Sequence, residues 1–129
     1  MKISVTGSRR GLTGRQRAFV LPLLADVKWL VHGGCIGVDR DVHRLFDYPE
    51  RTEVWPSNPE QYAWAQRAAI VHPIEPPLVR NRKIVNATPK LYAFASTYHE
   101  IQRSGTWATI RYARKIGHDV TVVWPDGSL

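Results

Sequence analysis

Short apolar runs alternate with amphipathic stretches along the whole chain. The apolar runs have the length and composition of buried strands, which predicts strands at 2–6, 29–32, 52–55, 91–95 and 119–124. Apolar residues at helical spacing lie between them and predict helices at 13–26, from about 37 to 46, and at 58–69, 78–87 and 106–116. This alternation predicts an α/β fold: a Rossmann-like, doubly wound, mostly parallel sheet with helices on both faces.

Local signals adjust several of these boundaries. Pro22 must kink or shorten the first helix, because a proline removes a backbone donor. Asn58–Pro59 is typical of a helix cap followed by a first-turn proline, with Gln61 placed to close a capping box. Gly117 is expected to cap the last helix. Irregular loops are expected at 71–77 and 96–104.

The bulk properties fit one domain with one core over residues 1–129. Hydrophobic residues make up 43% of the chain, enough for a packed core, and no apolar run reaches membrane-spanning length. The chain starts with a strand at 2–6, not a signal peptide. Cys35 is the sole cysteine, which excludes an internal disulfide and a cysteine-based metal site. We expect no cofactor, no metal and a cytoplasmic location.

The net charge is +7, from 18 Lys and Arg against 11 Asp and Glu, and the pI is about 10.0. Arginine dominates this excess, and its planar guanidinium suits phosphate oxygens. A phosphate-bearing or nucleic-acid partner is therefore favoured, although a basic surface can also serve solubility alone.

Three small-residue turns lie between a predicted strand and the next helix, at 5–10, 32–39 and 102–109. Such a turn leaves the first N–H groups of the helix free to bind an anion, and the helix dipole favours negative charge there. At Gly105 the lack of a side chain lets a ligand approach the backbone. Three such turns predict one phosphate-bearing ligand at the C-terminal edge of a parallel sheet.

The short helix at 78–87 places Asn81 on the same face as Ile84 and Val85, flanked by Arg80 and Arg82. Two interpretations have equal weight. Asn81 satisfies backbone groups of a neighbouring loop, or Arg80 and Arg82 reach a phosphate while Asn81 orders the loops around it.

In the last helix Trp107 falls outside the small-residue face and beside Arg111 and Arg114. An indole on a polar face can stack on a base or lie in a subunit interface. The interface is the favoured interpretation, and with it a homo-oligomer.

Asp39 lies in the first turn of the second helix. It caps that helix, which is the commoner role, or it bonds to a ribose hydroxyl or an exocyclic amine. His43 lies four residues later and is expected to form a surface ion pair with Asp39, or less often an acid–base pair. The histidines show no metal spacing. Ser8 and Ser104 lie in the anion-type turns and are interpreted as phosphate donors.

Four segments in this order resemble the SLOG superfamily, named for Smf-type DNA-processing proteins and Lonely Guy phosphoribohydrolases: Val-Thr-Gly-Ser-Arg at 5–9, His-Gly-Gly-Cys-x-Gly-Val-Asp at 32–39, Pro-x-x-x-Arg-Asn-Arg-Lys-Ile-Val at 76–85 and Ser-Gly-Thr at 104–106. The resemblance covers about residues 2–124 and is strongest to small stand-alone, YpsA-like members of bacteria and phages. It implies a modified Rossmann fold that binds nucleotides at its glycine loops. The sites it implies are Gly7, Ser8, Arg9, Gly33, Gly34, Asp39, Arg80, Asn81, Arg82, Ser104, Gly105 and Thr106.

The Lonely Guy enzymes have Pro-Gly-Gly-x-Gly-Thr-x-x-Glu at the last helix, and their glutamate works with an arginine placed like Arg82. This chain keeps Gly105–Thr106 but has Thr109 at the glutamate position. Cleaving an N-glycosidic bond needs a carboxylate. The resemblance therefore implies a binder, for sensing or sequestration of a nucleotide, an ADP-ribose-like molecule or a cyclic nucleotide. An N-glycosidase is the alternative, in which Asp39 or Glu100 would have to supply the carboxylate.

Residues 34–43 also resemble the Gly-x-Asp…His stretch of the DNA-processing proteins, which bind single strands. The +7 charge and Trp107 beside two arginines fit that partner. A single-stranded DNA-binding module is therefore a third hypothesis. The expected partners are a nucleotide-type small molecule or single-stranded DNA and a second copy of this chain, with no membrane.

Overall fold

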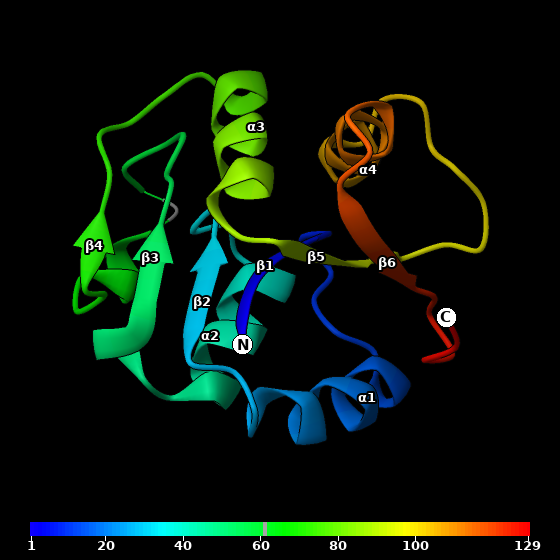
Figure 1. Ribbon diagram of the computed structural model, residues 1–129, viewed down its shortest axis with the longest axis horizontal. Helices are drawn as coiled ribbons and strands as arrows, with labels where there is room; N and C mark the ends of the chain where they lie inside the picture. Colours follow the sequence, from blue (N-terminus) through cyan, green and yellow to red (C-terminus); the bar gives the residue numbers. More distant parts are fainter. Residues whose placement is uncertain (61) are drawn as a thin grey trace.

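A computed structural model describes residues 1–60 and 62–129 and contains one six-stranded sheet (Figure 1). All the strand pairings are parallel, and the strands follow the order β4-β3-β2-β1-β5-β6. The strands are β1 (Lys2–Gly7), β2 (Trp29–His32), β3 (Thr52–Val54), β4 (Ile70–Val71), β5 (Lys90–Phe94) and β6 (Asp119–Val123).

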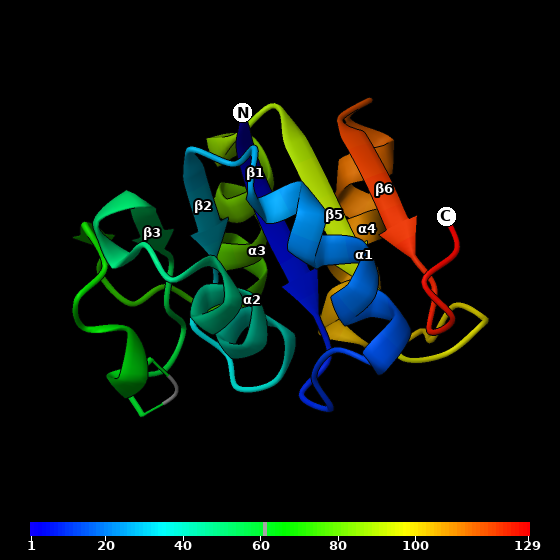
Figure 2. The ribbon, with the colours of Figure 1, turned by 90° about the horizontal axis from the view of Figure 1, so that it is seen from below.

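Helices cover both faces of this sheet. The helices are α1 (Gly14–Leu24), α2 (Val38–Phe46), α3 (Pro77–Ala87) and α4 (Gly105–Lys115), with short 3-10 helices at Pro49–Arg51 and Ala63–Ala65. Helices α1 and α2 lie on one face, and α3 and α4 lie on the other (Figures 1 and 2). The predicted Rossmann-like, doubly wound α/β fold is confirmed. In the described part of the chain, no helix has the length and apolar character needed to cross a bilayer.

Two layers of apolar side chains hold the helices on the sheet. One lies under α1 and α2 and includes Val20, Val42 and Phe46, whereas the other lies under α3 and α4 and includes Val85 and Ile110. β1 lies between the two layers, so even its serine is buried. The Ser4 hydroxyl donates to the Ile84 carbonyl at 2.6 Å, which gives this buried polar group a partner.

Trp107 belongs to the second layer, so the prediction of an exposed indole is wrong. Its side chain is 4% exposed and packs with Ile110 and Val122, and its ring lies 5.8 Å from that of Trp124. The buried arc of α4 is wider than the small-residue face suggested, because β6 extends the sheet beneath this helix. Trp107 is therefore neither a base-stacking residue nor evidence for a subunit interface.

The helix predicted at 58–69 is also wrong. Its described residues, 58–60 and 62–69, include turns and the short 3-10 helix, and β4 follows at Ile70–Val71, where an irregular loop was expected from residue 71. Tertiary contacts override its helical pattern: the Trp64 ring stacks on His32, and the Ala69 N–H donates to the Pro49 carbonyl at 2.9 Å. Asn58 forms a turn by accepting from the Glu60 N–H, and the capping role expected of Gln61 lies outside the described residues.

The remaining boundaries differ by small amounts. α1 continues through Pro22 and ends at Leu24, two residues before the predicted end, and α3 begins one residue early at Pro77. Gly117 adopts a φ of 71° after α4, which confirms it as the residue that ends this helix.

The strand order places a topological switch point between β1 and β5. From β1 the chain builds outward through β2 and β3 to β4, and then returns across the sheet to β5 on the other side of β1. In open α/β sheets, ligands bind beyond the carboxyl ends of the strands at such a point.

Candidate functional site

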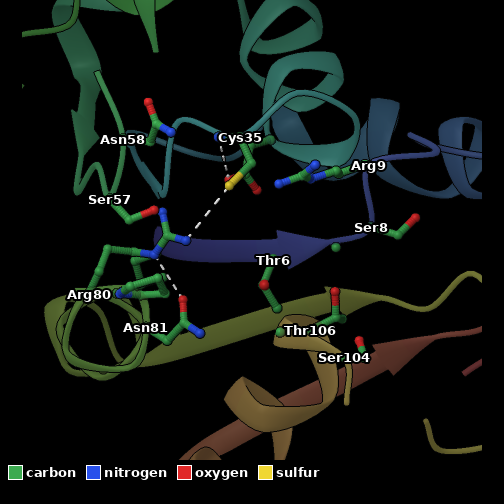
Figure 3. Close-up of a pocket in the computed structure, with 15 residues that line it drawn as sticks. Thr6, Ser8, Arg9, Cys35, Ser57, Asn58, Arg80, Asn81, Ser104 and Thr106 are labelled. Carbon is green, nitrogen blue, oxygen red and sulfur yellow. Dashed lines mark hydrogen bonds between the residues drawn. The ribbon is translucent and has the colours of Figure 1, made fainter. Parts of the chain in front are cut away.

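A cavity of about 540 Å³ lies beyond the carboxyl ends of the central strands (Figure 3). This volume falls within the range of roughly 300–1,000 Å³ that small-molecule sites occupy. The lining comes from the loops after β1, β2 and β3 and from the first turns of α3 and α4. The lining residues are Thr6, Gly7, Ser8, Arg9, Cys35, Asp39, Ser57, Asn58, Pro77, Arg80, Asn81, Ile84, Ser104, Gly105 and Thr106.

The cavity brings together most of the residues predicted from the sequence. Those that line it are Gly7, Ser8, Arg9, Asp39, Arg80, Asn81, Ser104, Gly105 and Thr106, whereas Gly33, Gly34 and Arg82 do not. Sequence reasoning missed Ser57 and Asn58. They follow β3 as polar residues, the same signal that identified the other loops, but the pattern around them was interpreted as the start of a helix.

Asp39 folds the loop between β2 and α2. Its carboxylate Oδ2 accepts from the N–H groups of Gly33 at 3.1 Å and Cys35 at 3.2 Å, and the residue is 5% exposed. Burial raises the pKa of Asp39 to about 6, although the charge of Arg80 and the two backbone hydrogen bonds act in the opposite direction. Asp39 therefore holds the glycine loop and also places a carboxyl group of unusual pKa in the cavity wall.

Arg80 is a buried arginine that joins separate segments. Its Nη1 donates to the carbonyls of Gly33 at 2.8 Å and Trp55 at 3.3 Å, and its Nε donates to the Asn81 Oδ1 at 2.8 Å. The guanidinium Nη2 lies 3.7 Å from the sulfur of Cys35. Because three of these bonds go to protein oxygens, Arg80 orders the loops around the cavity rather than presenting an open fork to a phosphate.

Gly33 and Gly34 were expected to contact the ligand, and the structure gives them packing roles instead. A Cβ at Gly33 would lie 2.6 Å from the Arg80 Nη1, so a side chain there would displace the guanidinium. Gly34 has a φ of 74°, and a Cβ there would meet Tyr62 and Val54. Gly33 therefore leaves room for the Arg80 guanidinium, and Gly34 provides the positive φ that the turn requires.

Arg82 lies outside the cavity, which corrects the prediction that it flanks the phosphate. Two residues along a helix are separated by about 200°, so when Arg80 points inward Arg82 points outward. Its guanidinium lies 5.3 Å from the ring centre of Tyr112. Together they line a second, shallower depression between α3 and α4, with Arg111, Lys115 and Ile116.

The first turn of α4 is the clearest candidate for an anion site in the cavity. Ser104 caps this helix, since its hydroxyl accepts from the Trp107 N–H at 3.3 Å. The N–H groups of Gly105 and Thr106 have no intrahelical partner at this position, and the helix dipole favours an anion. A Cβ at Gly105 would meet no atom within 4 Å, so the space before this turn is open. The exposed Arg9 adds a cation at the rim.

Two histidines support the glycine loop from behind. The buried His32 Nδ1 accepts from the Gly34 N–H at 2.9 Å, and its Nε2 lies 3.0 Å from the Nδ1 of His43. A backbone N–H only donates, so His32 carries its proton on Nε2 and donates it to His43. Burial lowers the pKa of both rings, and the neighbouring His43 lowers that of His32 further. The expected pair of His43 with Asp39 is therefore wrong: His43 contacts His32 and Trp64.

The carboxylates considered for catalysis lie in different places. Glu100 pairs with Arg111 at 2.5 Å and does not line the cavity, whereas Asp39 does. Thr109, at the position of the Lonely Guy glutamate, donates its hydroxyl to the Gly105 carbonyl at 2.9 Å and is 1% exposed.

Within residues 1–60 and 62–129, no three His, Cys, Asp or Glu side chains lie close enough to hold a metal ion.

Comparisons with known proteins add no assignment. No family model matches the sequence, and no curated protein is significantly similar to it. The case for a function therefore depends on the geometry of the cavity.

Arg80→Ala is expected to lower the free energy of unfolding by about 2–4 kcal/mol, because it leaves the buried Gly33 carbonyl and the half-buried Trp55 carbonyl without a donor. Arg82→Ala, two residues away on the same helix, removes only an exposed contact with Tyr112 and should change it by less than about 1 kcal/mol. Urea unfolding followed by circular dichroism measures both. Equal losses for the two variants would contradict the structural role of Arg80.

The histidine pair predicts a loss of stability in acid. Because the pKa of His32 is lowered in the folded state, the stability present above the unfolded value of 6.5 is lost as the pH falls below it. The expected slope is about 1.4 kcal/mol per pH unit for one such group. Asp39 acts in the opposite sense, since its raised pKa weakens the fold as the pH rises from 3.8 to about 6.

The variant His32→Asn isolates this effect, because an asparagine oxygen can accept from Gly34 and both proteins share the Asp39 contribution. Urea unfolding at pH 7.5, 6.5 and 5.5 should give a flatter profile for the variant than for the parent protein. Parallel profiles would show that His32 is not the group that titrates.

Proposed function

We propose that this chain is a small nucleotide-binding domain of the SLOG type, which holds a phosphate-bearing ligand in the cavity for sensing or sequestration. The observation that carries the proposal is the open first turn of α4, which faces the cavity at the switch point between β1 and β5. This is where Rossmann-like folds bind nucleotide phosphates.

Each segment has a defined part in this proposal. The N–H groups of Gly105 and Thr106 and the hydroxyl of Ser104 receive the phosphate. Arg9 neutralises its charge from the rim, and Ser8 contributes a further hydroxyl from the loop after β1. The rest of the cavity then has room for the ribose and base.

Gly105→Val is expected to weaken binding of inosine and adenosine monophosphate by at least about a hundredfold, because its side chain would occupy the open space before the helix. Gly14→Val is the matched control. Gly14 is likewise the first residue of its helix, and a Cβ there also meets no atom within 4 Å, but it does not line the cavity. Titration calorimetry measures the affinities, and circular dichroism confirms that both variants fold.

Two outcomes would overturn this assignment. A folded Gly105→Val protein with parental affinity would place the phosphate elsewhere. The absence of measurable binding of any nucleoside monophosphate to the folded parent protein would remove the proposed function itself.

An N-glycosidase is the second candidate, favoured by one observation: Asp39 places in the cavity a carboxyl group whose pKa is raised to about 6. Groups of this kind serve as general acids or bases near neutral pH. Against it, Asp39 already accepts two backbone N–H groups, and Thr109 replaces the glutamate that the resembling enzymes use.

We expect binding of adenosine monophosphate without turnover, since no carboxylate lies in the first turn of α4. Incubation with purified protein followed by chromatography detects any free adenine. If adenine forms in the parent protein and Asp39→Asn abolishes its release, Asp39 is the relocated carboxylate and the protein is an enzyme. Release that persists in the variant points to a contaminating hydrolase.

The other partners have less support. The hypothesis of a single-stranded DNA-binding module loses the residue proposed to stack on bases, because Trp107 is buried. The proposal of a homo-oligomer no longer rests on Trp107 but on exposed apolar side chains of α3 and of the residue that follows α4. These are chiefly Leu78, Val79 and Ile116, which are 65%, 42% and 46% exposed.

A further inference from the structure

The cavity has two chemically different ends (Figure 3). One end is formed by Ser8, Ser104 and Thr106 beside the first turn of α4, where the proposed function places the phosphate. The opposite end is formed by Ser57, Asn58, Arg80 and Asn81, from the loop after β3 and the first turns of α3. A ligand that spans the cavity from its phosphate therefore brings its far group to the end that holds Asn81 and, at its exposed edge, Asn58.

The orientation of the Asn81 amide is fixed by Arg80. The side-chain atom of Asn81 that faces the Arg80 Nε at 2.8 Å must be the oxygen, because arginine has donors only. The amide nitrogen lies on the other side, turned away from Arg80 and toward α4 in Figure 3. Asn81 therefore offers N–H donors to the cavity.

The Asn58 amide is fixed in the same way by a backbone group. Its oxygen accepts from the Glu60 N–H at 2.9 Å, since a backbone N–H cannot accept. Its nitrogen then faces the side of Cys35 in Figure 3. The exposed Asn58 and the half-buried Asn81 lie on opposite sides of the Arg80 guanidinium in Figure 3, so their donors do not converge on one ligand atom. Asn81 is the one that lies beside the buried Arg80.

The surroundings of these amides suit the edge and face of a base rather than a second phosphate. The Arg80 guanidinium lies directly behind Asn81, but its Nε and Nη1 are already bonded to protein oxygens. Its positive charge still favours a partly negative ligand atom and disfavours an amino group. Pro77 and Ile84, three or four residues from Arg80 and Asn81 on α3, also line the cavity and add apolar surface against which a ring can pack.

We propose that this end of the cavity selects a nucleobase with an exocyclic carbonyl oxygen, of the hypoxanthine, guanine or uracil type, over one with an amino group at that position. Asn81 is the specificity-determining residue. This inference rests on the proposed function, since it assumes a nucleotide whose phosphate lies at α4. A site built from donors rejects an amino group because donor would face donor and both would lose their partners.

Inosine and adenosine monophosphate provide the sharpest comparison, because they share the ribose phosphate and differ in carrying oxygen or nitrogen at position 6 of the base. Titration calorimetry on the full chain should give inosine monophosphate an affinity about tenfold or more higher. Uridine and cytidine monophosphate form a second pair with the same change, and uridine monophosphate should bind more tightly.

Asn81→Asp tests the residue responsible. The aspartate keeps an oxygen for the Arg80 Nε but removes the donors, so the ratio of the two affinities should fall about tenfold or more, toward one or below. The ratio of the two affinities is the readout, because the added negative charge weakens the binding of both monophosphates to the same degree. Asn86→Asp is the control: it adds the same charge on the same helix, but Asn86 is bonded to Tyr112 outside the cavity, so the ratio should stay at the parental value.

The outcomes separate the two proposals. Equal affinities for inosine and adenosine monophosphate in the parent protein, or a ratio that Asn81→Asp leaves unchanged, would overturn the base preference while the nucleotide site stands. A preference for adenosine monophosphate would overturn it as well. If the folded protein binds neither nucleotide, the proposed function fails and the base preference fails with it.

Discussion

The buried guanidinium of Arg80 is the interaction on which the architecture of the site depends. It bonds to the carbonyls of Gly33 and Trp55 and to the side chain of Asn81, so it connects the loop after β2, the end of β3 and the first turns of α3. A buried cation is costly unless its donors are satisfied, and here protein oxygens provide the partners. Three segments that are distant in the sequence are thereby held around one cavity.

The two parts of the site have different structural roles. One side, built on Arg80, Asp39 and the neutral pair of His32 and His43, fixes the loops through hydrogen bonds that are satisfied within the protein. The other side, at the first turn of α4, keeps backbone donors and open space for a ligand. Residues that resemble binding groups in the sequence therefore include some whose hydrogen bonds are satisfied within the protein and some that are left open to the cavity, and only the hydrogen bonds distinguish them.

The sequence predicted the fold and the place of the cavity, because both depend on local patterns. Strand–turn–helix units with glycines at 7, 33 and 105 set the switch point, and the cavity forms there. It could not reveal which way neighbouring residues point. Arg80 and Arg82 are equivalent in the sequence, but the carbonyl of Gly33 attracts one of them and Tyr112 packs with the other. Trp107 and the segment around Trp64 were misjudged for a related reason, since partners distant in sequence, Trp124 and His32, decide their placement.

The central claim is that an anionic ligand binds at the switch point, against the first turn of α4. Titration of the ¹⁵N-labelled protein with inosine monophosphate, followed by amide chemical shifts, tests it most directly. The account predicts that the amides of Ser8, Arg9, Gly105 and Thr106 shift together and saturate with one affinity, while those around Arg82 and Tyr112 in the second depression do not move. Shifts confined to the second depression would contradict it.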